Sequence, residues 1–580
     1  MSFIIHYVKQ YKLRAFLAPL FKMLEAIFEL LVPLVMASII NKGIKSADTH
    51  FIIRMSGVLL FLAIVGLLFS ITAQYFSAYV AVYSAADIRR DLFAKILSLS
   101  QGTKDKIGDE VLTTRITSDV NQIQNGINMV LRLFLRSPFI VVGATIMAFV
   151  VDVKSALIFI AVVIVLSLIV FIIMKYTLPR YKTIAARLEK VLHATSENLE
   201  GARVLRAFCQ VDEEKEAFEN KTNNLVQMQL HTGKVSALLN PVTYVVVNIG
   251  VVVLIYMASG RVNDGHILQG DVVALVNYMG QILVELIKLA NLIVILMKAF
   301  PSADRVREIM SMKSDERCQD KLPINSTAID GAKGSISLKN VSFSYTGGNE
   351  MDIENISLDI PAGSTLGIIG GTGSGKSTII KLLNHTFDAT SGVVEIDGQD
   401  VRNLTDSHLA YNFGIVPQRA SLFSGTIRSN MTMKDVESSD DEIKTALNIA
   451  QALDFVEEKG GLEAEVTAKG SNFSGGQRQR LTIARALIGK PRVLVLDDSS
   501  SALDLATEAR LKKALEALPW KPTMIIVSQR ASSLLSADQI MVLEDGRCVG
   551  LGTHKQLLES CPTYAEIYYC QYPREEALGE

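Results

Sequence analysis

The sequence predicts a membrane α-helical bundle with six transmembrane helices, followed by an α/β domain. Three observations carry this prediction. The first 300 residues are rich in long apolar segments, whereas the rest has the composition of an ordinary soluble domain. From Ser335 onward, short β-type runs such as TLGIIG and RVLVLDD alternate with helical segments, which is typical of a largely parallel sheet. At 580 residues, the chain is also too long for a single hydrophobic core.

Six segments are apolar over the ~20 residues that a membrane-spanning helix needs. They lie at residues 15–40, 52–80, 128–150, 156–178, 238–260 and 267–299. Three connections are short, while the other two, 81–127 and 179–237, are long, polar, helical in pattern and rich in Lys and Arg. Because basic loops stay in the cytosol, the N-terminus is predicted to be cytosolic. The alternative is a large soluble helical bundle, and this charge asymmetry argues against it.

The predicted domains are residues 1–300 for the membrane domain, 301–334 for a linker and 335–580 for the α/β domain. The linker segment is charged, contains Gly, Pro and Ser, and is expected to begin as a helix. The net charge of −1 gives no sign of a nucleic-acid partner. The partner that composition does indicate is the lipid bilayer.

A strand, a glycine-rich loop and a helix are predicted in TLGIIGGTGSGKSTIIKLL. This segment fits G-x-x-x-x-G-K-S, in which backbone N–H groups close around phosphate oxygens and the helix N-terminus adds its dipole. Lys376 is expected to reach the β- and γ-phosphates, and the Ser377 hydroxyl to bind Mg²⁺. The α/β domain is therefore predicted to be a P-loop NTPase domain that binds ATP and Mg²⁺. The candidate residues of this loop are Gly370, Gly371, Thr372, Gly373, Ser374, Gly375, Lys376, Ser377 and Thr378.

Two further segments extend the nucleotide prediction. The apolar run VLVL is followed directly by Asp497, which is expected to supply a second Mg²⁺ contact. In SNFSGGQRQRLTIARAL, small residues precede a helix and form a second candidate anion site, made of Ser474, Gly475, Gly476 and Gln477. One chain has no second phosphate for this segment, so we expect it to close over ATP held by another chain.

With these motifs in order, the sequence resembles the ABC transporter family, and within it the exporter half-transporters, along essentially its whole length. The resemblance implies that Tyr345 stacks on adenine and that Gln418 contacts Mg²⁺ and senses the membrane domain. It also implies that FSGGQ is the family signature and that Ser501 to Asp504 form the D-loop. LTTRITSDVNQIQ and ENLEGARVLRAF resemble the coupling helices that rest on nucleotide-binding domains.

The two candidate catalytic positions depart from the family pattern. Asp498 stands where the family has the glutamate that polarises the attacking water, so its carboxylate is expected to be set back by about an ångström, which can cost on the order of 10²-fold in rate. Gln529 replaces the usual histidine; it can donate to the γ-phosphate but carries no charge. Before the signature, Ala468 replaces an expected acidic residue. The site should bind ATP well and hydrolyse it slowly.

A blunted site beside an intact signature resembles one half of a heterodimeric multidrug exporter, whose partner half-transporter supplies the consensus Glu and His. The alternatives are a homodimeric lipid, peptide or siderophore exporter, and an ATP-gated regulator that transports nothing. A soluble ABC ATPase does not fit the six spans. The expected location is the plasma membrane, multi-pass, with the nucleotide-binding domain in the cytosol.

Polar residues within the predicted spans are candidates for substrate contact. Glu25 and Glu29 lie one turn apart in the first span, where a carboxylate is costly. They either line a cavity for amphipathic, including cationic, small molecules, or form interhelical hydrogen bonds or lie near the headgroups. Asn277, Gln281 and Glu285 repeat at helical spacing in the last span and present the same alternatives.

Overall fold

The computed structural model describes residues 2–314, 333–345 and 350–572. By its internal contacts the chain divides into two units. A helical unit comprises Met1–Leu97 and Gly108–Met312, and an α/β unit comprises Ser98–Ile107 and Lys313–Glu580. Most of the predicted linker, residues 315–332, lies outside the described residues.

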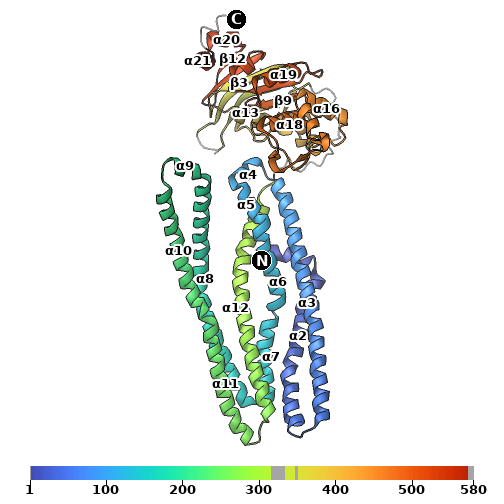
Figure 1. Ribbon diagram of the computed structural model, residues 1–580, viewed down its shortest axis with the longest axis vertical. Coiled ribbons are helices and arrows are strands. Elements are labelled where there is room, and N and C mark those ends of the chain that lie inside the picture. The colour runs from blue at the N-terminus through green and yellow to red at the C-terminus, as the bar shows by residue number, and fades with distance from the viewer. Residues whose placement is uncertain (1, 315–332, 346–349, 573–580) are drawn as a thin grey trace. The chain divides into compact units, whose positions relative to one another are not determined.

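The helical unit contains long helices (Figure 1). They are α1 (Ser2–Lys9), α2 (Lys12–Ser38), η1 (Ile39–Ile44), α3 (Thr49–Leu97), α5 (Asp109–Thr114), η2 (Arg115–Asp119), α6 (Val120–Leu133), α7 (Arg136–Val151), α8 (Val153–Glu200), α9 (Ala202–Ala207), α10 (Val211–Ala237), α11 (Leu239–Asn263) and α12 (Gln269–Ser311).

Within the described residues, five helical stretches are long and apolar enough to cross a membrane. They are Lys12–Ile44, Thr49–Leu97, Asp109–Val151, Val153–Glu200 and Val211–Asn263. The sixth predicted span, 267–299, is helical within α12 but is not one of these five. The predicted span 128–150 is divided between α6 and α7, which are separated by Phe134 and Leu135.

Small buried side chains allow the helices of this unit to approach closely. Ala26 of α2, Ala144 and Ala148 of α7, and Ala274 of α12 are fully buried in one apolar cluster. Without much hydrophobic gain between helices in a membrane, such close packing is a main source of attraction.

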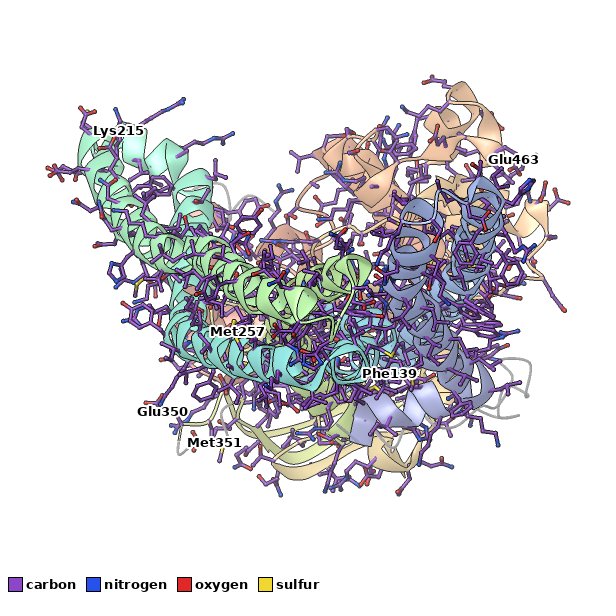
Figure 2. All side chains as sticks on the ribbon, turned by 90° about the horizontal axis from the view of Figure 1, so that it is seen from below. Phe139, Lys215, Met257, Glu350, Met351 and Glu463 are labelled. Atoms are coloured by element: carbon purple, nitrogen blue, oxygen red, sulfur yellow. The ribbon has the colours of Figure 1, made fainter. Side chains whose placement is uncertain are left out.

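Helices α8 to α11 form an arm beside the other helices of this unit (Figure 1). Figure 2 labels Lys215 of α10 and Met257 of α11 on this arm. Apolar side chains near its turn are exposed, with Leu199 at 74% and Phe208 at 72%. Such exposure on one arm is expected of a surface that meets another protein.

The α/β unit contains the remaining elements. Its helices are α4 (Gln101–Ile107), α13 (Lys376–Leu383), η4 (Val401–Asn403), α14 (Asp406–Asn412), α15 (Ile427–Met431), α16 (Asp440–Ile449), α17 (Leu453–Glu458), η5 (Gly461–Glu463), η6 (Ala468–Gly470), α18 (Gly475–Leu487), α19 (Leu505–Glu516), η7 (Ala531–Leu534), α20 (His554–Ser560) and α21 (Pro562–Gln571). Its strands are β1 (Ile336–Phe343), β2 (Ile353–Ile360), β3 (Thr365–Gly370), β4 (Ser391–Ile396), β5 (Gln399–Asp400), β6 (Phe413–Val416), β7 (Gly425–Thr426), β8 (Glu465–Val466), β9 (Val493–Asp497), β10 (Thr523–Val527), β11 (Gln539–Glu544) and β12 (Arg547–Gly552).

The main sheet confirms the predicted α/β fold with a largely parallel sheet. Its strand order is β12-β11-β3-β10-β9-β6, and only β12 pairs antiparallel. Strand β9 is covered on both faces, because Val493 and Val495 join one apolar cluster and Leu494 and Leu496 join another. That double burial explains its continuous apolar sequence. A second, antiparallel sheet has the order β2-β1-β4-β5.

Candidate nucleotide site

The predicted nucleotide residues gather at the carboxyl ends of four neighbouring parallel strands. The phosphate loop follows β3, Asp498 follows β9, Gln529 lies two residues beyond β10, and Gln418 lies two residues beyond β6. Strand β10 lies between β3 and β9, so these three loops are adjacent. In open α/β sheets this edge is where ligands bind.

The phosphate loop needs its glycines for both conformation and space. Gly373 and Gly375 have φ of +85° and +98°, a region that favours glycine. A Cβ at Gly370 would collide with the carbonyl oxygen of Leu543, and one at Gly375 would collide with Ile353. The loop leads directly into α13, whose first N–H groups are free to face an anion.

The side chain of Lys376 is folded back over its own loop. Its Nζ donates to the carbonyl oxygen of Gly370 at 2.9 Å and to that of Gly371 at 2.5 Å. Burial lowers the pKa of Lys376, and the nearby carboxylates of Asp497 and Asp498 oppose that effect. A phosphate would offer the ammonium group a stronger acceptor than these carbonyls.

Oxygen ligands suited to a divalent cation converge next to this lysine. The Ser377 hydroxyl and the Asp497 carboxylate are 3.5 Å apart. Burial and the adjacent Asp498 carboxylate raise the pKa of Asp497, so the site has an excess of negative charge that a cation would relieve. A hydroxyl and a carboxylate are the hard donors that Mg²⁺ prefers, so these residues fit the predicted ion.

Asp498 is held in an uncommon backbone conformation. Its φ is +45°, and its N–H donates to the Val527 carbonyl oxygen at 2.9 Å. Burial raises the pKa of Asp498, whereas a hydrogen bond from Gln418 and the positive charges of Arg530 and Lys376 lower it. The predicted Gln418 side chain therefore contacts the predicted catalytic carboxylate.

Gln529 begins a loop that is hydrogen-bonded to side chains of helix α19. Its side chain is exposed, and its carbonyl oxygen accepts from Gln571 Nε2 at 2.7 Å. The next residue, Arg530, pairs with Glu508 of α19 at 3.1 Å. The cation nearest in sequence to Gln529 is thus already engaged by a carboxylate.

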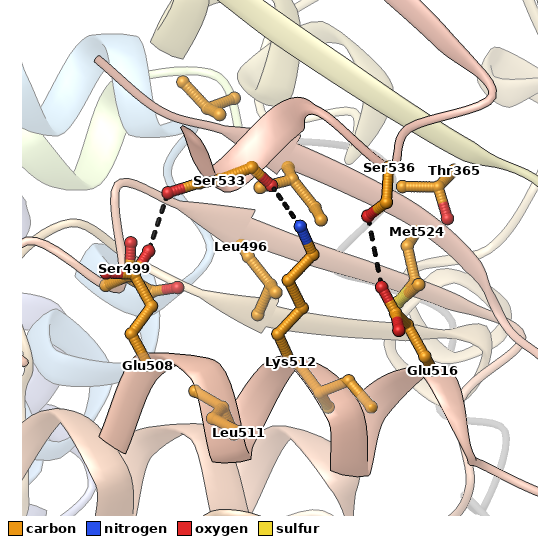
Figure 3. A pocket seen from close by; sticks show the side chains of 14 residues that line it. Thr365, Leu496, Ser499, Glu508, Leu511, Lys512, Glu516, Met524, Ser533 and Ser536 are labelled. Atoms are coloured by element: carbon orange, nitrogen blue, oxygen red, sulfur yellow. Dashed lines mark hydrogen bonds between the residues drawn. The ribbon is translucent and has the colours of Figure 1, made fainter. Parts of the chain in front are cut away.

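Three side chains one turn apart on α19 anchor this loop (Figure 3). Glu508 accepts from the Ser533 hydroxyl at 2.6 Å, Lys512 donates to the Ser533 carbonyl oxygen, and Glu516 accepts from the Ser536 hydroxyl. Between helix and loop lies a cavity of about 310 Å³, bordered by Ser499 and Ser500 beside Asp498. The loop after Asp498 and the loop after Gln529 therefore both lie beside helix α19.

Tyr345 lies among aromatic and cationic groups. Its hydroxyl is 3.2 Å from that of Thr378, and its ring meets Phe387 edge-on at 5.2 Å between centroids. The Lys381 ammonium lies 5.3 Å from the ring centroid. Tyr345 remains 37% exposed, and stacking on a base requires such an accessible ring.

The signature residues cap α18. Gln477 N–H donates to the Ser474 hydroxyl at 3.3 Å, and Ser474 N–H donates to Gln477 Oε1 at 3.0 Å. Ser474 and Gly475 are exposed, and so is Ala468 before them. Over the residues that the structure describes, no hydrogen bond or ion pair joins Ser474–Gln477 to the phosphate loop. The signature and the phosphate loop are thus two separate candidate anion sites.

The predicted coupling segment LTTRITSDVNQIQ, residues 112–124, belongs to the helical unit, and its coupling role stays a prediction. A segment that was not singled out from the sequence, Ser98–Ile107 with α4, packs in the α/β unit. There Gly102 lies against Phe387, and a Cβ on it would come within 2.9 Å of the Phe387 ring. A short polar helix has no hydropathy signal, and Phe387 was not identified from the sequence.

The three glutamates of the predicted spans, Glu25, Glu29 and Glu285, are paired with cations. Arg136 of α7 donates to Glu285 of α12 at 2.6 Å and to Glu29 of α2 at 2.7 Å. Lys22 pairs with Glu25, and Lys288 with Glu285. Three carboxylates therefore face three cations. The bonds of Arg136 to Glu285 and Glu29 agree with the alternative that these acids form hydrogen bonds between helices. Glu29 alone keeps substantial exposure, at 41% of its side chain.

The two amides of α12 behave differently from these acids. Asn277 is exposed and donates to the Val273 carbonyl oxygen of its own helix at 3.0 Å. Gln281 has a buried Oε1 without a partner among the described residues. Arg136 was missed from the sequence, although an arginine inside the predicted span 128–150 was an available signal.

Two family models match the chain. One, described as the ABC transporter transmembrane region, matches residues 15–286, and the other, described as ABC transporter, matches residues 353–501. Together they cover most of the helical unit and, in the α/β unit, the phosphate loop, Gln418, the signature, Asp497 and Asp498.

Curated relatives align along almost the full length. The chain is 33% identical to an uncharacterized ABC transporter ATP-binding protein of Mycobacterium tuberculosis, over 98% of this chain and 97% of the relative. It is 32% identical to the uncharacterized ABC transporter ATP-binding protein YfiB of Bacillus subtilis, over 98% of each. An ATP-dependent lipid A-core flippase of Vibrio vulnificus is 26% identical, over 98% of this chain and 96% of that protein.

Proposed function

The chain belongs to the ABC transporter family as an exporter-type half-transporter, and we propose that it is the slow-site subunit of a heterodimeric efflux pump. The family assignment makes it an ATP-binding, multi-pass membrane protein that pairs with another ABC half. The proposal adds that its own ATP site holds nucleotide while the partner's site hydrolyses it.

ATP binding is assigned to the carboxyl edge of the main sheet. The backbone of Gly370–Gly375 and the Lys376 ammonium would hold the phosphates, and Tyr345 would stack on adenine. Ser377 and Asp497 would hold Mg²⁺, with Gln418 beside them. Mg²⁺ supplies charge neutralisation at the phosphates, while these side chains orient the nucleotide.

The observation that carries the slow-site proposal is the pair Asp498 and Gln529. The Asp498 carboxylate is one methylene shorter than glutamate, and Gln529 offers no positive charge at the γ-phosphate. The neighbouring Arg530 does not compensate, because it is paired with Glu508. The groups that bind ATP are therefore complete, whereas the two groups that promote its hydrolysis, Asp498 and Gln529, are weakened.

The signature supports a role in the partner's site. Ser474 and Gly475 are exposed at the N-terminus of α18, where backbone N–H groups face outward. A partner with the consensus glutamate and histidine would complete a competent site against this signature. The exposed Leu199 and Phe208, on the arm formed by α8 to α11, support docking on a second chain.

The proposed substrates are amphipathic small molecules, exported across the plasma membrane with both nucleotide-binding domains in the cytosol. A second candidate, a homodimeric lipid exporter, is favoured by one observation: Glu25, Glu29 and Glu285 are paired with Lys22, Arg136 and Lys288, so these three acids leave no excess negative charge to select cationic drugs. One relative is named as a lipid A-core flippase, at 26% identity.

Inverted membrane vesicles test the proposal. Vesicles containing this chain alone, or this chain with a candidate second half-transporter, are supplied with Mg-ATP and a fluorescent amphipathic dye. The proposal expects ATP-dependent dye uptake only when both chains are present and purify as a one-to-one complex. Equal uptake by this chain alone would favour the homodimer.

A further inference from the structure

We propose that the helical unit binds an anionic phospholipid, with one acyl chain in a pocket between α1, α6 and α12 and the phosphate held by Lys9 and Lys12. The pocket has a volume of about 450 Å³. This site is separate from the nucleotide site and does not depend on which substrate the protein exports.

Helix α1 and the residues that follow it are bonded to α3. Tyr7 is 4% exposed, and its hydroxyl donates to Asp91 of α3 at 3.1 Å. The Tyr11 hydroxyl donates to Asp87 of α3 at 2.7 Å. These bonds hold Ile4, Ile5 and Val8 on the pocket side, so the space is a built feature of the fold.

The opposite wall is formed by α6 and α12, which pack closely against each other. Helices α6 and α12 already touch at Gly126, where a Cβ would come within 2.6 Å of Ala299 Cβ. Val130 and Phe134 of α6 and Leu296 of α12 continue the apolar lining. Water gains no hydrogen bonds in such a pocket, whereas a lipid chain removes its apolar surface from water.

Charge at the margin selects the lipid class. Of the residues that line the pocket, only Lys9 and Lys12 carry charge. Both are exposed, and within the described residues neither forms an ion pair. Lys12 also begins the first candidate membrane span, the place where a phospholipid headgroup lies.

A phospholipid fits this pocket better than a helix of the partner chain. A covering apolar helix would bury two ammonium groups without supplying a counter-charge, which is costly. A phosphate pairs with both lysines while its acyl chain fills the apolar interior.

Native mass spectrometry of the full-length protein tests the site. The protein in detergent receives dioleoyl phosphatidylglycerol or dioleoyl phosphatidylcholine, and bound lipids are counted. The double variant Lys9→Glu/Lys12→Glu should lower phosphatidylglycerol affinity by at least about tenfold and lower phosphatidylcholine affinity much less, because the choline cation offsets the phosphate charge. The matched control Lys42→Glu/Lys45→Glu, which reverses two exposed charges at the other end of α2, should bind as the parent does.

Two further measurements test the apolar pocket separately from the two lysines. Val130→Trp narrows the pocket and should weaken both lipids, with its melting temperature checked against the parent. A photo-crosslinking amino acid at Ile5, exposed at 46%, should yield a lipid adduct in membranes of the assembled transporter. Unchanged phosphatidylglycerol binding in Lys9→Glu/Lys12→Glu, or a crosslink to the partner chain, would overturn the proposal.

Discussion

The backbone N–H of Asp498 donates to the carbonyl oxygen of Val527 at 2.9 Å. This bond joins the end of β9 to the end of β10, two residues before Gln529. The two positions at which the chain departs from the family pattern are therefore held together at one edge of the sheet. Their effects on hydrolysis should be coupled, because contacting loops rarely behave additively.

Asp498→Glu alone should raise the ATPase rate only a few-fold, because Gln529 still provides no positive charge. Gln529→His alone should likewise give a small gain. Together they should approach the ~10²-fold that correct placement of a reacting group can contribute. Steady-state hydrolysis by the four purified proteins measures the coupling. Full recovery from Asp498→Glu by itself would show that Gln529 is irrelevant.

Changing the signature should harm hydrolysis more than changing this chain's own carboxylate. Ser474→Ala removes the hydroxyl that caps α18, and Gly476→Asp adds a side chain where a Cβ would lie 3.0 Å from the Ala502 carbonyl oxygen. In the assembled complex either should lower the ATPase rate by roughly 10²-fold, whereas Asp498→Asn should have little effect. The reverse ranking would mean that the competent site is this chain's own.

Glu285 and Glu29 bond the same arginine but differ in burial, so they form a matched pair. Glu285 is 3% exposed at its side chain and Glu29 is 41% exposed. Glu285→Gln breaks a buried ion pair and should destabilise the protein by about 3 kcal/mol, while Glu29→Gln should cost under about 1 kcal/mol. Thermal unfolding in detergent measures both. Equal shifts in melting temperature would contradict the buried network.

Gly102→Ala should impair ATP use through Phe387, because the added Cβ would come within 2.9 Å of that ring and the ring meets Tyr345. Overpacking of this kind typically costs about 1–3 kcal/mol. The KM for ATP should rise, and Phe387→Leu in the same chain should reverse the effect. Gly66→Ala in α3, where a Cβ meets nothing within 4 Å, is the control. A double variant as poor as Gly102→Ala would rule out the steric explanation.

The phosphate loop and the main sheet could be predicted because their signals are local. A strand, a glycine loop and a helix are contiguous in sequence, and β9 is apolar throughout because it is buried on both faces. The grouping of Asp498, Gln529 and Gln418 follows once the strands are parallel.

Long-range pairing could not be predicted. Arg136 bonds partners 107 and 149 residues away, and no sequence spacing encodes those distances. Helix α4 lies in the segment 81–127 that is predicted to be helical, but nothing in its short, mostly polar sequence indicates that it packs in the α/β unit. Strands β2 and β6 were also missed. In β2, buried and exposed residues alternate only from Ile356 to Ile360, and β6 is only four residues long.

The most direct test of the slow-site account is the fate of ATP on the purified chain without a partner. Radiolabelled ATP with Mg²⁺ is bound, free nucleotide is removed, and the bound ATP and ADP are measured over time, with Asp498→Glu/Gln529→His as the competent control. The account predicts that the unchanged chain keeps most of its nucleotide as ATP while the control converts it to ADP. Brisk, drug-stimulated hydrolysis by a stable homodimer of the unchanged chain would contradict it.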